Sequence, residues 1–393
     1  MNADDYALDD FSISKGGPIN YALLKLGLKM NQVKLLVAGL CFTWLPLVIL
    51  TTIEGTLYSG SPLPFLDDIA MQARILLALP MLIMIKAPID YKSIAVLKYI
   101  TGALLSPEDR STFLTTTLRK CRALTSSILT DIILLLIVIV ATLSLVKSGV
   151  YSGLKIDTSS WMASMTNGQQ SLSLAGKWTV FISIPIFQFV MLRWLWKYII
   201  WIYLLFRLSQ TRLKLMPTHS DRAGGLGIII LAQRSYSMIF MALSIVLSGQ
   251  LIAQLLQEPD SVIVIRNVVI AYVVLSLFLI ICPLLFFIGK LLKTKHQGLF
   301  HLSNLGAELS RKFEDDWISK KPIEERIEEN PVDPSMLYDY ESMYDLLQQF
   351  RIVPVTIRDV IGIGIPILLP FIPILFVLFS AGELFKKIIE LMM

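Results

Sequence analysis

Two cations interrupt a long apolar segment at the spacing of one helical turn. Residues 178–206 are almost entirely apolar or aromatic, yet Arg193 and Lys197 stand near their middle. Positions four apart share a helix face, and Gln188 lies close to the same stripe. A cation at the bilayer centre costs at least about 2.5–3.5 kcal/mol on insertion scales, so it usually contacts protein or water. We expect Arg193 to face the bundle interior; the alternative is that both cations snorkel to the membrane surface.

Few polar groups in the apolar segments could pair with Arg193. Asp131 is the only acid well inside one, and it stands near the end of its segment. Arg234 lies early in the apolar segment that follows the central one. The sequence thus predicts a buried polar set, or the lining of a transport path, made of Arg193, Lys197, Gln188, Arg234 and Asp131.

The loop 217–227, PTHSDRAGGLG, carries a second group of candidate residues. Gly224 and Gly225 free the backbone just before a helix begins, and Arg222 stands beside them. Amide groups at a helix start attract anions, so the loop could hold an anion or a lipid headgroup. The alternatives are a tight turn capped by Asp221, a metal pair of His219 and Asp221, or an acid and base formed by the same two residues.

The composition defines the class of protein. Of 393 residues, 55% are hydrophobic and 17% are charged, and the mean hydropathy is +0.66. Soluble domains are closer to a quarter charged, so we predict an all-α, polytopic transmembrane bundle of six to seven spans. The net charge of +5 is concentrated in particular loops, which indicates membrane topology and no nucleic-acid partner. The three cysteines form no CxxC pair, and no disulfide framework is expected.

The chain divides into four regions. Residues 1–32 are a polar lead-in, 33–289 a bundle of six spans with cytoplasmic loops 86–122 and 207–227, 290–357 a charged linker with helices, and 358–393 a seventh apolar span with an amphipathic tail. The second span is weak, since only 11 apolar residues with Pro80 among them separate Arg74 from Lys86. It could cross as a short kinked helix or re-enter. The Pro-rich stretch 359–380 could likewise cross or form a re-entrant hairpin, and we favour crossing.

Basic residues indicate the orientation. Segments 86–122, 207–222 and 290–326 hold seven, four and eight Lys or Arg, whereas 54–74, 147–177 and 257–266 hold one, three and one. The four lysines of the first 34 residues lie on the richer side. The positive-inside rule therefore predicts a cytoplasmic N-terminus.

The motifs RWLWKYIIW and LMPTHSDRAGGLG, followed by LLPFIPILF and ELFKKIIELMM, resemble an uncharacterised family of bacterial polytopic inner-membrane proteins. That family has an aromatic-basic helix, a PTHxDxAGGLG-type loop and a Pro-rich last span. The resemblance covers about residues 178–393 and implies the bacterial inner membrane. It carries over no functional residues, because the family has no established activity.

Three functions are compatible with the sequence. A channel or transporter for an anion or small solute is favoured by the cations within spans. A non-transporting anchor or effector, for example in a stress or phage-defence system, would act through 290–357. A lipid enzyme would use His219 and Asp221. We predict no enzyme, no catalytic residue, no metal site and no cofactor; the expected partners are the lipid bilayer, with further copies of the chain and a soluble protein at 290–357 as alternatives.

Overall fold

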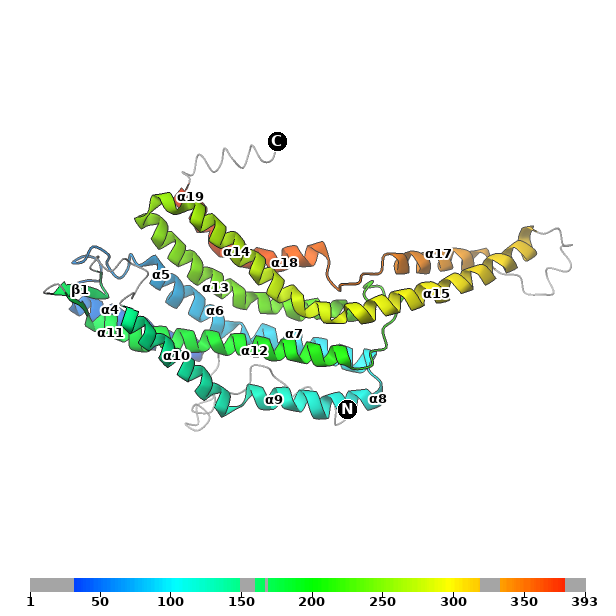
Figure 1. Cartoon of the computed structure of the whole chain (residues 1–393), viewed down its shortest axis with the longest axis horizontal. Helices are drawn as coiled ribbons and strands as arrows, with labels where there is room; N and C mark the ends of the chain where they lie inside the picture. The colour runs from blue at the N-terminus through cyan, green and yellow to red at the C-terminus, as the bar shows by residue number, and fades with distance from the viewer. Residues whose placement is uncertain (1–31, 149–159, 167–168, 319–332, 379–393) are drawn as a thin grey trace.

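The computed structural model describes residues 32–148, 160–166, 169–318 and 333–378 (Figure 1). The predicted lead-in and the amphipathic tail lie outside these residues. The described chain is an all-α bundle with one short hairpin, β1 (Ala163–Thr166) and β2 (Gln169–Leu172). The predicted fold class is confirmed.

Within these described ranges, six helices are long and apolar enough to cross a membrane, and a bent pair raises the total to seven. The bend is 42° and joins Pro107–Thr125 to Ile128–Ser144. The six are Gln32–Ile53 (α3, Gln32–Thr43, and α4, Leu45–Ile53), Ile69–Leu104 (α5, Ile69–Gln72; α6, Leu79–Met84; α7, Lys86–Tyr99), Leu174–Gln210 (α11, Leu174–Trp178, and α12, Ile184–Gln210), Leu226–Gln257 (α13, Ile229–Gln257), Val262–Ile318 (α14, Val262–Ile281, and α15, Ile288–Phe313) and Ile357–Leu378 (α18, Ile357–Leu368, and α19, Ile372–Leu378). The bent pair contains α8 (Pro107–Thr112), α9 (Arg119–Thr125) and α10 (Ile128–Ser148), and α17 spans Pro334–Gln348.

The second span differs from the weak, short segment that the sequence predicted. It runs without a loop from Ile69 to Leu104, so much of the predicted loop 86–122 is helix. Pro80 is tolerated because it stands at the start of α6, directly after a π-helical segment, Ala73–Ala78. Residues 86–104 continue this helix, but their sequence is polar enough to resemble a loop. A hydropathy window therefore misses this second half of the helix.

The Pro-rich last segment runs along α13 and does not turn back within the described residues. Asp359, at its start, contacts Arg234 near the start of α13. Phe371 and Ile374, near its end, pack with Leu255 at the far end of α13. The two helices therefore run side by side over their length, and the described residues of the last segment form no hairpin.

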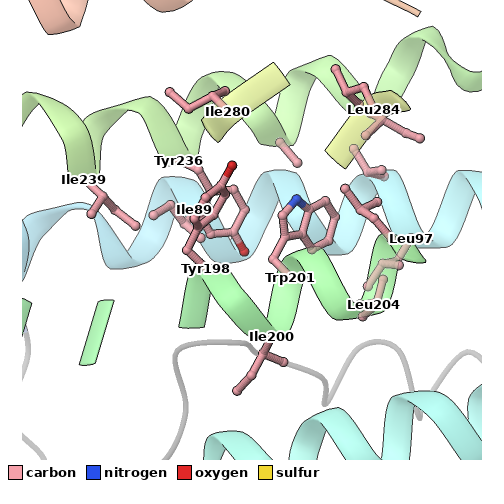
Figure 2. Packing of buried hydrophobic residues seen from close by; sticks show 14 of the residues in the cluster. Ile89, Leu97, Tyr198, Ile200, Trp201, Leu204, Tyr236, Ile239, Ile280 and Leu284 are labelled. Atoms are coloured by element: carbon pink, nitrogen blue, oxygen red, sulfur yellow. The ribbon is translucent and has the colours of Figure 1, made fainter. Parts of the chain in front are cut away.

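The core is centred on α12 and α13, whose aromatic side chains stack between α7 and α14 (Figure 2). Trp201 stacks on Tyr236 with ring centroids 5.5 Å apart. Pro283 has no N–H group, so the carbonyl of Leu279 lacks its helical donor, and the Tyr198 hydroxyl donates to it at 2.9 Å. The aromatic helix thereby satisfies a backbone group that the proline leaves free.

The end of the bundle that carries β1 and β2, the hairpin end, is held by a buried aspartate. Asp68 Oδ1 accepts from the backbone N of Met71 at 2.9 Å and caps α5. Its Oδ2 accepts from Trp161 Nε1 at 3.0 Å, and Trp161 is fully buried. Glu54 accepts from the backbone N of Leu174 at 2.6 Å and ties α4 to α11. The opposite end, which carries the loop 217–227, is called the basic end below.

Candidate functional site

Arg193 is directed into protein and pairs with Asp131. Its Nη1 forms a salt bridge with Asp131 Oδ1 across α12 and α10, and the two side chains are 13% and 8% exposed. Its Nη2 donates to the carbonyl of Thr125 at 3.4 Å, which lies at the corner between α9 and α10. Trp196 Nε1 donates to the neighbouring carbonyl of Leu124 at 3.4 Å. Arg193 thus faces the bundle as predicted, and it fastens the bend between α9 and α10.

Lys197 and Gln188 differ from Arg193 in their immediate surroundings. Lys197 is 7% exposed, and its Nζ lies 4.4 Å from the ring centroid of Trp194. A cation over a tryptophan face is attracted by the ring quadrupole. Gln188 Oε1 is buried and has no hydrogen-bond partner among the described residues. Each of these polar groups therefore has its own surroundings.

Arg234 belongs to a different contact, with the last span. Its Nη2 lies 2.9 Å from Asp359 Oδ1 and donates to the carbonyl of Arg358 at 3.3 Å. Asp359 also accepts from the backbone N of Thr356 at 2.8 Å, and Thr356 caps α18 in return. Sequence reasoning missed Asp359, although Thr-x-x-Asp before an apolar run is close to the capping-box signature.

The loop 217–227 is a closed turn built around Asp221. The carboxylate accepts from the backbone N of Ala223 at 2.8 Å, of Gly225 at 3.1 Å and of Gly227 at 2.9 Å. Burial alone would raise the pKa of Asp221, but these amides and His219 lower it below its ordinary value of 3.8. The amides expected to cradle an anion already bind a carboxylate of the protein, so that part of the prediction is wrong.

The glycines of this loop have the geometry that the sequence predicted. Gly224 and Gly225 have φ angles of +65° and +94°, which residues that carry a Cβ rarely adopt. A Cβ on Gly225 would lie 3.0 Å from Leu104 Cδ2. Arg222 also has a positive φ, +52°, which is uncommon for a residue other than glycine. The backbone here is fixed by the contacts around it.

His219 is held by α7 and by the loop itself. Its Nε2 lies 3.1 Å from the hydroxyl of Tyr99, and its Nδ1 lies 2.8 Å from Asp221 Oδ1. Both ring nitrogens therefore have partners within the chain. Through these two contacts His219 joins the loop 217–227 to the end of the second span and holds the loop in position.

No three His, Cys, Asp or Glu side chains gather at a metal-binding distance within the part of the chain that the structure describes. The site residues thus form three separate contacts, Arg193 with Asp131, Arg234 with Asp359, and His219 with Asp221. The chain matches no known protein-family model, and neither a curated protein nor a solved structure is significantly similar to it.

Proposed function

We propose that this membrane protein is an anchor or effector that acts through helices beyond the membrane. The observation that carries the proposal is that two arginines expected to line a transport path are paired with carboxylates. Arg193 pairs with Asp131, and Arg234 pairs with Asp359. A guanidinium beside a carboxylate offers a passing anion little net charge, so these residues are better suited to fasten helices than to line an anion path.

The extramembrane part is an arm, which we define as residues 298–313 of α15 together with α17 (Figure 1). The continuous helix Val262–Ile318 has 57 residues, or about 85 Å at 1.5 Å each, whereas a bilayer core is about 30 Å thick. The arm is therefore long enough to extend well past the lipid. Gly298 packs against Leu347, and Gly306 packs against Tyr340, which brings the two helices close together.

The arm exposes apolar side chains, which in water indicate an interaction surface. Phe300 is 66% and Tyr338 is 72% exposed. Asp339, Glu341 and Asp345 are exposed on α17, so the surface would suit a partner with basic groups around an apolar contact.

The positive-inside rule supports a cytoplasmic location for the arm and the basic end. Lys and Arg are concentrated in the segments at that end, as counted above. A bacterial inner membrane rests on the family resemblance of the sequence, and the two inferences are compatible.

A channel or transporter is the second candidate. It is favoured by Gln188, whose buried Oε1 has no hydrogen-bond partner among the described residues and would be satisfied by water in a conducting path. Its anion selectivity would need an unpaired cation, and Arg193 and Arg234 are both paired.

Photo-crosslinking in cells tests the proposal. A photoreactive residue at Tyr338 reports on the arm, and one at Ile270, an exposed side chain of α14, is the matched control. We expect a discrete protein adduct from position 338 and none from position 270. If position 338 gives no adduct, and a photoreactive residue at Phe300 gives none either, the result would contradict an effector that acts through the arm.

A further inference from the structure

Three arginines converge on one cavity at the basic end. The cavity has a volume of about 520 Å³ and is lined by Arg222, Arg351 and Arg358, with Gln349 and Thr356 beside them. Arg222 comes from the loop between α12 and α13, Gln349, Arg351 and Thr356 come from the segment between α17 and α18, and Arg358 stands in the first turn of α18. The cavity therefore lies where the bundle, the arm and the last span meet.

Backbone contacts hold the two segments in place. The backbone N of Arg351 donates to the carbonyl of Arg222 at 2.7 Å, and its Nη2 donates to the carbonyl of Asp221 at 2.5 Å. Lys295 of α15 donates to the carbonyls of Gln348 and Phe350 at 3.0 and 3.1 Å. The backbone of Arg222 and both the backbone and the side chain of Arg351 are thus held before any ligand arrives, which lowers the cost of binding.

The charge of this cluster is not neutralised by neighbouring acids. None of the three arginines forms an ion pair with another described residue. The acids next to Arg222 and Arg358 in the sequence are engaged elsewhere, since Asp221 binds backbone amides and Asp359 binds Arg234. Arg351 Nε is moreover buried without a hydrogen-bond partner within the described ranges. Three like charges on one cavity repel one another unless an anion joins them.

We propose that this arginine pocket binds a phosphate group. Guanidinium groups recognise phosphate through paired, charge-assisted hydrogen bonds, and a donor such as Arg351 Nε would gain a partner. The volume lies within the usual range for small-molecule sites, so it admits a diphosphate or a larger phosphate ester. Ile357, the first residue of the last apolar helix, also lines the pocket, so a lipid phosphate is a candidate ligand beside a soluble one.

Two binding measurements separate these sources. The purified full chain in nanodiscs of phosphatidylcholine is titrated with inorganic pyrophosphate by calorimetry. The same protein is also placed in nanodiscs that contain phosphatidic acid. Native mass spectrometry then releases the protein from the nanodisc, and the number of phosphatidic acid molecules that stay bound to it is measured. Pyrophosphate binding identifies a soluble phosphate ligand, and selective retention of phosphatidic acid identifies a headgroup.

The variants are Arg222→Gln and Arg358→Gln, and the control is Arg311→Gln on the arm, which removes the same charge from an exposed position. Neither pocket side chain donates a hydrogen bond to a described residue, so both variants should keep the wild-type melting temperature. We expect each to weaken binding about ten-fold or more in at least one measurement, the typical effect of losing a charge-assisted contact, and the control to leave it unchanged.

Equal binding by wild type and both pocket variants, or an equal loss in the control, would overturn the proposal. The pocket stands independently of the effector function, because a transporter could hold the same ligand. Failure of the crosslinking experiment therefore leaves this test intact, and the reverse also holds.

Discussion

Removing one partner of the Arg193–Asp131 pair should cost far more stability than removing both. The two side chains are 13% and 8% exposed and lie between α12 and α10. Arg193→Met leaves the Asp131 carboxylate buried without its cation, and breaking a buried ion pair in this way costs about 3–5 kcal/mol. Replacing both, as Arg193→Met with Asp131→Leu, should be close to neutral or stabilise the fold, since well-packed apolar pairs often match buried ion pairs.

The assay is a double-mutant cycle on the free energy of unfolding, measured by denaturant titration of the protein in detergent micelles. Arg266→Met is the control, because Arg266 is an exposed arginine of another apolar helix, α14. The coupling between positions 193 and 131 should amount to a few kcal/mol, in the range that buried charge pairs show. Additive effects of the two substitutions would refute the reasoning, as would an Arg193→Met protein that unfolds like the control.

Three further results are expected at the ends of the bundle. Asp221→Asn should lower the melting temperature at neutral pH, because three backbone amides lose a charged acceptor. Each donor that is left unsatisfied costs about 1–3 kcal/mol of folding free energy. The folded pKa of Asp221 is lowered, so the stability that its carboxylate contributes is present above the ordinary value of 3.8 and is lost as pH falls through the folded pKa. The melting temperatures of the variant and the wild type should therefore converge at low pH. A difference in melting temperature that stays constant with pH would contradict this. Gly225→Val should reduce the yield of folded protein in detergent chromatography, because its φ is +94° and a Cβ there would contact Leu104. Gly289→Ala should not reduce the yield, because nothing lies near a Cβ at that position. Equal yields would contradict the conclusion that the turn at Gly225 is constrained. A cysteine at Arg311 should be protected from a membrane-impermeant reagent in intact cells and one at Tyr58 labelled, and the reverse pattern would invert the proposed orientation.

Much of the bundle could be predicted from local sequence, because lipid requires long apolar helices whose backbone groups are satisfied internally. The scarcity of acids within the spans made Asp131 one of few candidate partners for Arg193, and the structure shows that pair. The positive φ of Gly224 and Gly225 followed from the glycine pair before a helix. In each case the constraint acts within one segment or leaves few alternatives.

The remaining features depend on which helices are neighbours, and the sequence contains no local signal for that. Arg234 and Asp359 are paired because α18 lies along α13. Arg222 shares a cavity with Arg351 and Arg358 although more than a hundred positions separate them. Helical continuation through residues 86–104 is stabilised by packing against α13 and α12, as the buried Val96 and Leu97 show, so hydropathy alone could not find it.

We infer that Arg193 and Arg234 hold helices together and do not form an anion path. Anion flux into vesicles that contain the purified protein tests it most directly. The wild-type protein should pass no more chloride or phosphate than protein-free vesicles, and the doubly substituted Arg193→Met, Asp131→Leu protein should behave identically. Selective anion flux through the wild type, abolished in that folded double variant, would contradict the account and establish a conducting path at Arg193.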